Sequence, residues 1–494
     1  MEAELDIRSH VWRWSPGLLL VAALAAFAAP PALAAPPARV LPAAQVRLLL
    51  RSGPVALQGI TIRGTLDLRP LGTVEHRLSC RNCRLEGDLV GSGVVFDRTL
   101  DLSGSQIAGA VKMEGARFRE PVLLGSPPAL GPTGFGGRID FSLAKFDDFV
   151  SFEEARFAKY ADFVYARFGG EAIFTGGVFA AGVSFDRAWF ASAADFRQRM
   201  FRSRASLVAS EFRGEADFSQ ARFLREADLS LVRFDGDAAF VGTEFAGFDS
   251  ESAVSFERAT VDGTINFAFS SFWNDADFSR MTARRASFGD AQFRPRPSIV
   301  MANFAPADLQ MSVGTVLASV QPDERRTILH LIEASAKSRG DLGVANDAHY
   351  AQEVLASHGY TWARRSLDFT FYRLAAGYFV RPLRPLTVFV VLVLLFSLAR
   401  CVRRHHVEPS SRAAPDDRGS RRRRLRLVGR ELGLFGSQCL DTISYASRVR
   451  ARPEVAVGAP TRLEILAYRV LVICVLIGLA NSNPTLRQML DALL

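Results

Sequence analysis

Few residues in this chain have a type and spacing that could support chemistry. Cys80 and Cys83 form a CxxC pair, and thiols at this spacing can form a disulfide, supply half of a zinc site or act as a redox dithiol. No second CxxC and no nearby pair of histidines completes four zinc ligands. A thioredoxin-like site needs a following helix, where the residues here favour strands. We expect a structural pair, either a disulfide or two buried thiols, with the zinc and redox interpretations as alternatives.

Other catalytic or metal-binding signatures are absent from the sequence. There is no GxSxG elbow, no P-loop, no GxGxxG after a strand and no HExxH. His330, His349 and His358 are irregularly spaced, which is typical of surface residues rather than of metal ligands. The sequence therefore predicts no catalytic residue, no metal site and no cofactor, and an enzyme built from distant residues is the alternative.

A repeat of eleven residues organises the segment Phe141–Phe245. Two bulky residues recur in it with spacings of five and six, and a short fixed period is typical of a solenoid. Glycines such as Gly182 and Gly214 disfavour a helix, because each costs a helix interior about 1 kcal/mol, and Phe favours strands. One series of bulky residues comprises Phe141, Phe152, Phe163, Phe174, Phe185, Phe196, Leu207, Phe218, Leu229 and Phe240, and the other comprises Phe146, Phe157, Phe168, Phe179, Phe190, Phe201, Phe212, Phe223, Phe234 and Phe245.

The finer pattern within each repeat is that of a strand. A small residue often stands two positions before the bulky one, as in Ala161/Phe163 and Ala216/Phe218, and residues two apart share one face of an extended chain. Segments such as ADFSQ, ARFLR and ADFVY resemble the motif of the pentapeptide-repeat proteins. The resemblance implies a right-handed quadrilateral β-helix, in which each side of a four-sided coil carries one pentapeptide.

The size of the coil follows from the length of the repeat. Eleven residues span roughly 36 Å, and a square of that perimeter is too narrow for facing Phe rings, so we expect coils of roughly 22 residues. Each series then divides into two ladders, and strands in neighbouring coils are about 4.8 Å apart. One ladder stacks Phe146, Phe168, Phe190, Phe212 and Phe234. We interpret the rings as a packed core rather than as an aromatic ligand box.

The mainly β solenoid is predicted to extend over residues 46–310, with its most regular part at 141–245. From Pro322 the apolar residues take a helical period, and glycines mark two helix ends. Residues 322–375 are therefore expected to form a short α-helical cap or linker that covers the open end of the coil.

Residues 1–34 have the pattern of a secretory signal peptide. Arg8 and Arg13 precede an apolar run of thirteen residues at Gly17–Ala29, and Ala32–Ala34 matches an A-x-A cleavage site. The run is short for a membrane span, which needs about 20 residues. We expect a signal for export, and an uncleaved anchor is the alternative.

Two apolar segments near the C-terminus are predicted to be membrane helices, at residues 379–399 and 463–480. The first contains an uncharged run of only fourteen residues, Leu386–Ala399, so the flanking Arg381, Arg384 and Arg400 would snorkel. The second contains Glu464 and Arg469, and a charge at the bilayer centre is costly. A re-entrant or interfacial helix is therefore the alternative for the second segment.

The positive charge of the chain is local. The net charge is +9, yet residues 141–304 hold 23 acidic and 19 basic residues, whereas Arg400–Arg430 holds eleven arginines against three acids. Arginines beside a span stay in the cytoplasm and attract anionic lipids, so residues 400–462 are expected to form a basic cytoplasmic loop, with a short tail at 481–494. Nucleic-acid binding is the alternative for this run, but the run lacks aromatic residues for stacking, and we expect no nucleic-acid partner.

The C-terminal region resembles that of bacterial membrane-anchored pentapeptide-repeat proteins. The features that carry the resemblance are Gly340-Asp341, Ala345-Asn346 and Tyr350, followed by the RPLRPL entry to the first apolar segment and the ANSNPTLR exit from the second. The resemblance implies a rod held at the plasma membrane and no general activity.

We therefore expect a non-catalytic binding or scaffold protein of the bacterial envelope, with an extracytoplasmic repeat domain. Its expected partners are the lipid membrane and an envelope protein or glycan. A component of a channel or transport system is an alternative, although a TVGYG-like filter is absent. A DNA mimic that binds topoisomerases, as the resemblance to soluble pentapeptide-repeat proteins implies, is a further alternative that requires a cytoplasmic, strongly acidic rod.

Overall fold

The computed structural model describes residues 39–126, 131–246, 253–293 and 298–367, together with single positions up to residue 473. The predicted signal peptide, the basic loop and the C-terminal tail lie outside these residues, as do the two predicted membrane helices apart from those single positions. Within the part of the chain that the structure describes, no helix is both long and apolar enough to cross a membrane.

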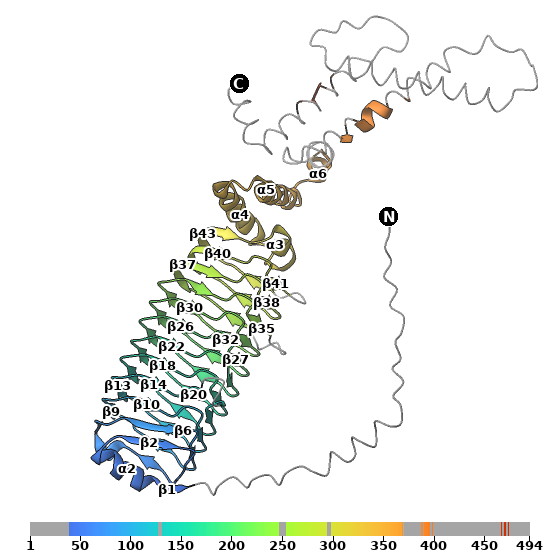
Figure 1. The fold of residues 1–494 in the computed structure, drawn as a ribbon. Helices are drawn as coiled ribbons and strands as arrows, with labels where there is room; N and C mark the ends of the chain where they lie inside the picture. Colours follow the sequence, from blue (N-terminus) through green and yellow to red (C-terminus); the bar gives the residue numbers. More distant parts are fainter. Residues whose placement is uncertain are drawn as a thin grey trace, which may run out of the picture.

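A parallel β-solenoid occupies most of the described chain (Figure 1). Its strands are short, and through the regular part of the rod each strand pairs with the strand four places later. Thus β17 (Lys145–Phe146) pairs with β21 (Arg167–Phe168), and β18 (Val150–Ser151) with β22 (Ala172–Ile173). This 22-residue register matches the predicted coil size. The strands form sheets of 12, 20 and 11 strands, the largest of which joins two neighbouring faces, so the rod has four faces and about twelve coils.

The largest sheet contains two columns of paired strands, which are joined where long strands run continuously around one corner. These strands lie near the C-terminal end of the rod and are β37 (Thr260–Asn266), β40 (Thr282–Ser287) and β43 (Ala305–Gln310). One of these two columns of strands carries the candidate site. Its regular part comprises β9 (Val95–Phe96), β13 (Arg117–Phe118), β17, β21, β25 (Trp189–Phe190), β29 (Glu211–Phe212) and β33 (Arg233–Phe234).

Two kinds of corner alternate along the coil and account for the spacings of five and six. In the five-residue segments, the residue two positions after the bulky one is left-handed, with φ of 59° at Leu143, 57° at Tyr165 and 55° at Arg187. This conformation costs a non-glycine residue roughly 1–2 kcal/mol. The N–H of Leu143 donates to the carbonyl of Val164 on the next coil at 2.9 Å, and that bond helps to hold the corner.

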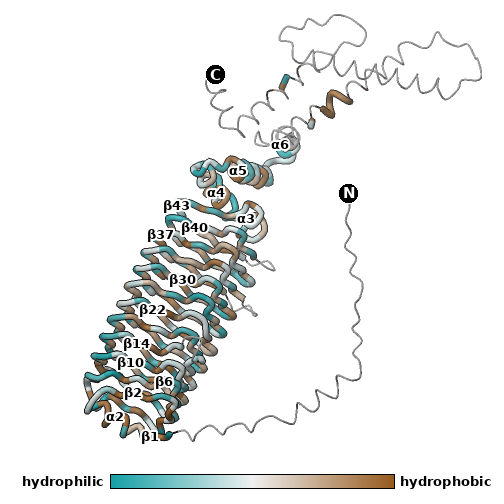
Figure 2. The backbone as a smooth tube through the Cα atoms, viewed as in Figure 1, coloured by the Kyte–Doolittle hydropathy of each residue, from teal (hydrophilic) through white to brown (hydrophobic). Residues whose placement is uncertain are grey.

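Phenylalanine ladders fill the interior of the rod. Ring centroids along the first ladder are 5.1, 4.6, 4.5 and 5.0 Å apart from Phe146 through Phe168, Phe190 and Phe212 to Phe234. Those of the second are 4.5, 5.4, 4.5 and 5.3 Å apart from Phe157 through Phe179, Phe201 and Phe223 to Phe245. These ten side chains are buried. Hydrophobic and hydrophilic residues accordingly alternate along the coils (Figure 2), and the rings contact one another as a packed core.

A helix covers the N-terminal end of the rod, where the sequence predicted strands from residue 46. Helix α2 (Ala43–Ser52) follows β1 (Val40–Pro42) and buries Ala43, Val46 and Leu50 against the first coils (Figure 1). These three residues are three and four positions apart, which is a helical spacing. The solenoid strands resume with β2 (Val55–Gln58).

Helices also cover the C-terminal end, beginning before the predicted start at residue 322 (Figure 1). They are α3 (Val313–Ser319), α4 (Arg325–Arg339), α5 (Leu342–Ser357) and α6 (Trp362–Leu367). Helix α4 packs against β43, and the Ser335 hydroxyl accepts a 2.9 Å hydrogen bond from the N–H of Leu309. The cap thereby pairs part of the last strand, which would otherwise expose backbone groups.

Candidate functional site

A groove runs across four successive coils at one corner of the solenoid. It encloses about 620 Å³, and its lining residues are Leu143, Lys145, Tyr165, Arg167, Arg187, Trp189 and Glu211. Three of them are the left-handed corner residues described above. The other four begin strands β17, β21, β25 and β29, which are in register. The 22-residue coil thus places seven outward side chains in two parallel rows, with about 4.8 Å between neighbouring strands.

Three cations in the groove have no acidic partner in the described part of the chain. They are Lys145, Arg167 and Arg187, all exposed. One coil earlier in the same column, by contrast, Arg117 pairs with Asp147 at 2.7 Å. The groove therefore combines net positive charge with guanidinium donors that are available to a ligand.

Aromatic side chains lie between these cations. The Tyr165 side chain is 44% exposed, and Trp189 is partly exposed on the next coil. The guanidinium of Arg187 lies 5.4 Å from the centroid of the Tyr165 ring and also donates to its phenol oxygen. Beside Arg167 and Trp189, the next outward positions are Gly169 and Ala191, whose small size leaves the face of the sheet flat there.

The equivalent corner on the other side of the coil has exposed arginines but no aromatic side chain, because its strands begin with Arg156, Val178, Met200 and Arg222. Its left-handed residues over the same coils are Glu154, Gly176, Gln198 and Gln220. The backbone conformation is the same at both corners, so the groove arises from its side chains. Cations beside aromatic faces suit a ligand with anionic groups on an apolar body, because guanidinium matches carboxylate and phosphate geometry and the rings supply apolar contact.

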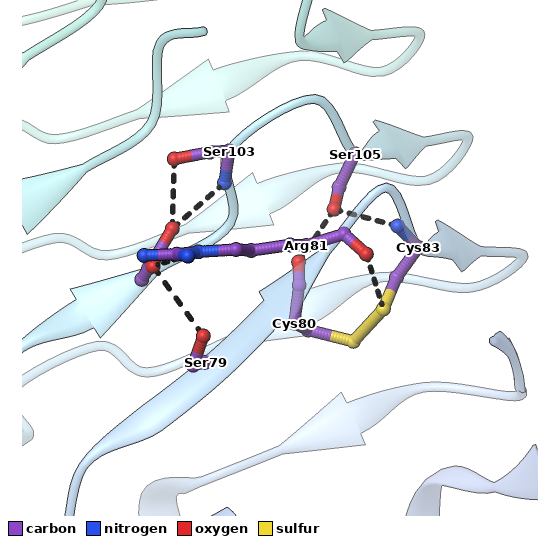
Figure 3. The surroundings of a disulfide bond; sticks show 7 residues. Ser79, Cys80, Arg81, Cys83, Ser103 and Ser105 are labelled. Carbon is purple, nitrogen blue, oxygen red and sulfur yellow. Dashed lines mark hydrogen bonds and ion pairs between the residues drawn. A yellow bond between two sulfur atoms is a disulfide. The ribbon is translucent and has the colours of Figure 1, made fainter. Parts of the chain in front are cut away.

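The Cys80–Cys83 pair forms a disulfide, with Cα atoms 5.7 Å apart (Figure 3). Cys80 lies in β6 (Leu78–Arg81), and Cys83 directly precedes β7 (Arg84–Leu85). Both side chains are buried. The Ser105 hydroxyl donates to the carbonyl of Cys80 at 2.6 Å and accepts from the N–H of Cys83 at 2.9 Å. The bridge therefore closes a buried corner of the coil, which is a structural role.

A buried carboxylate lies beside this corner. Asp101 is fully buried, and it accepts hydrogen bonds of 2.7 Å from both Arg81 Nε and the Ser103 hydroxyl. Burial, the largest single influence, raises the pKa of Asp101, but the hydrogen bonds from Ser103 and Arg81 together hold that pKa below its ordinary value. The carboxylate is fully engaged in holding neighbouring coils.

Arg199, an arginine that is buried in the core, was not identified from the sequence. It occupies an inward position that holds Ala155, Gly177 and Ala221 in neighbouring coils, and its side chain is fully buried. Its Nη1 donates to the carbonyl of Gly176 at 2.7 Å. Its Nε and Nη2 atoms have no hydrogen-bond partner among the described residues.

Aromatic rings surround the guanidinium of Arg199. The guanidinium carbon lies 4.3 Å from the centroid of the Phe179 ring and 5.1 Å from that of Phe157. Burial lowers the pKa of Arg199 to about 9. Gly177, at the same position one coil earlier, has no side chain and so leaves room for the arginine. The sequence does contain a signal for this arrangement: an arginine at an inward position that usually holds a small residue, with a glycine 22 residues before it.

One histidine of the C-terminal cap lies beside an acid. His349 Nδ1 lies 3.4 Å from a carboxylate oxygen of Glu333, which also pairs with Lys337. No group of three or more His, Cys, Asp or Glu side chains in the described residues is arranged to hold a metal ion. The groove remains the candidate functional site.

Comparison with known families agrees with this geometry. A model of pentapeptide repeats, in nine copies, matches residues 200–244. The solenoid is built of pentapeptide repeats. The chain matches no curated protein and no solved structure. A pentapeptide-repeat solenoid indicates a structural or binding protein.

Proposed function

We propose that this pentapeptide-repeat protein is a non-catalytic binding or scaffold protein, anchored in the plasma membrane of a bacterial cell with its solenoid outside the cytoplasm. The observation that carries the binding role is the groove. It holds Lys145, Arg167 and Arg187 without ion pairs beside two aromatic side chains. Such a surface attracts an anionic partner, and its cations oppose the role of a DNA mimic, which needs an acidic surface.

Two further observations support the location. The Cys80–Cys83 disulfide is of the kind that persists in oxidising compartments. The arginine-rich segment 400–430 lies between the two apolar segments, and arginines beside a span favour the cytoplasmic side. A rod that precedes the first span would then lie on the opposite side of the membrane from this segment.

Labelling of single cysteines in intact cells tests this proposal. The five native cysteines are replaced by serine, and the variants K159C, at an exposed position of the rod, and S411C, in the arginine-rich segment, are treated with a membrane-impermeant thiol reagent. We expect K159C to react in intact cells and S411C to react only after lysis. Reaction of S411C alone in intact cells would show that the rod is cytoplasmic and would overturn the proposal.

A further inference from the structure

We propose that the groove binds a linear acidic polysaccharide, whose sugar rings lie against Tyr165 and Trp189 and whose carboxylates pair with Lys145, Arg167 and Arg187. This inference rests on the proposed function, because it names the ligand class of the same surface. The site comprises side chains from four successive coils, and it extends along the rod rather than into it.

Charge complementarity is the first argument. The three cations have no acidic partner in the described chain, while the one carboxylate of the groove, Glu211, pairs with Arg213 at 2.6 Å. A guanidinium binds a carboxylate through two parallel hydrogen bonds. Because outward positions recur at each coil, about 4.8 Å apart, a polymer with regularly spaced carboxylates meets a cation on each of three successive coils.

The aromatic residues are the second argument. The C–H faces of a sugar ring are apolar, and they pack on the rings of Tyr and Trp, whose polar atoms stay available to hydroxyl groups. Arg187 holds Tyr165 in place through its phenol oxygen and its ring. Gly169 and Ala191 leave a flat floor beside Trp189. The site is thus preorganised, which reduces the entropy lost on binding.

The neighbouring strands disfavour an acidic peptide. Strands β21 and β25 each pair with a strand on both sides. A bound peptide therefore finds no open strand edge with which to form main-chain hydrogen bonds, and these supply much of the affinity when peptides add to sheets. Only side chains line the groove.

The sparse charge disfavours a nucleic acid. Tight binding of nucleic acids commonly uses roughly six to ten phosphate contacts, whereas the groove offers three cations. The surrounding residues 141–304 hold 23 acidic against 19 basic residues, so the rod offers no extended basic track that could contact further phosphates beyond the groove.

The test uses the full-length protein purified in detergent and immobilised for biolayer interferometry. The probes are polygalacturonate and, as a matched neutral polymer, its methyl ester. Polyglutamate and an oligothymidylate represent acidic peptides and nucleic acids. The variants are K145Q/R167Q/R187Q, which removes the charge, and W189A, which removes an aromatic contact. R156Q is the matched control, since Arg156 is an exposed residue at the same place in the repeat but begins β19 (Arg156–Phe157), two faces away.

We expect binding of polygalacturonate with at least tenfold preference over the methyl ester. The triple variant and W189A are each expected to weaken binding at least tenfold with unchanged far-UV circular dichroism, and R156Q to leave it unchanged. Equal or tighter binding of polyglutamate or oligothymidylate would overturn the polysaccharide assignment. Absence of binding, or an equal loss in R156Q, would overturn the groove as the site. The cysteine labelling reports on location independently, so each proposal can fail alone.

Discussion

Arg199 offers the sharpest test of whether a charge buried in the core of this solenoid lowers the stability of the fold. Replacing it with methionine keeps an unbranched side chain of similar reach and removes a charge with two unpartnered nitrogens from the core. The fall of its pKa from the ordinary arginine value to about 9 corresponds to a penalty of about 5 kcal/mol at neutral pH. The lost hydrogen bonds to the carbonyls of Gly176, Phe152 and Phe174 cost about 1 kcal/mol each. We therefore expect Arg199→Met to raise the free energy of unfolding at pH 7 by about 1–4 kcal/mol.

The pH dependence gives this prediction its signature. Burial lowers the pKa of Arg199 in the folded state, so the unfolded chain binds the proton more tightly than the native state does. The penalty is fully present below pH 9 and is relieved as the pH rises through 9 toward the ordinary pKa of arginine. Between pH 8 and pH 10 the wild-type protein should therefore gain about 1.4 kcal/mol relative to Arg199→Met.

The assay is urea denaturation followed by far-UV circular dichroism at both pH values. Arg197→Met is the control, because Arg197 is exposed and paired with Asp195 at 2.6 Å. Other groups that titrate in this range are common to all three proteins and cancel in the differences. An Arg199→Met protein that is less stable than wild type, or a difference that does not change with pH, would refute the reasoning and show that the native state compensates the buried charge.

Three further predictions concern the core and the corners. Phe190→Ala should lower the free energy of unfolding by about 3–5 kcal/mol, measured by urea denaturation, because the ring is buried between two stacked neighbours; a loss under 1 kcal/mol would contradict a packed ladder. Gly109→Ala should lower the melting temperature, because a Cβ there would lie 2.4 Å from the backbone of Gly87, while Gly289→Ala, whose Cβ would meet Ser287 and Ala268 only at ordinary contact distances of 3.8 and 4.0 Å, should not; equal melting temperatures would contradict the close corner. The free energies of unfolding of wild type and Asp101→Asn, measured by acid denaturation, should converge below pH 3.8. The lowered pKa of Asp101 stabilises the fold above that pH, and this stabilisation is lost as the pH falls through the native pKa. A constant difference between pH 5 and pH 2 would contradict this.

The fold could be predicted from the repeat, because the positions that face the core accept few types of residue. Phe146 and Phe168 are 22 residues apart and stack in the interior, and that spacing follows from the width of two facing rings. Helix α2 was missed because its three buried residues precede the periodic region and occupy only a few turns. Arg199 was missed because a position that tolerates only small residues gives no sign that a neighbouring glycine has made room.

The groove was harder to predict, although each of its residues stands in the sequence. Once the coil has 22 residues, Lys145, Arg167 and Trp189 must form one column, and Tyr165 and Arg187 the column beside it. What the period cannot show is which outward cations find an acid on the next coil, as Arg117 does. That depends on the side-chain conformers of neighbouring columns rather than on the repeat.

The same register that builds the core also determines what the surface can display. Successive residues of a strand point to opposite faces, so a one-residue shift in the register of β21 would exchange its inward and outward positions. The core would reject the change, because Phe168 would turn outward and Arg167 inward. Selection for a buried phenylalanine ladder therefore also preserves the alignment of Arg167 with Trp189, while leaving the chemical type of these outward residues free to vary. A rod of this kind can acquire a binding surface by substitution alone: at the corner of Glu154 and Gln198 the neighbouring strands begin with Arg156, Val178, Met200 and Arg222, so this corner has no aromatic side chain at the equivalent outward positions.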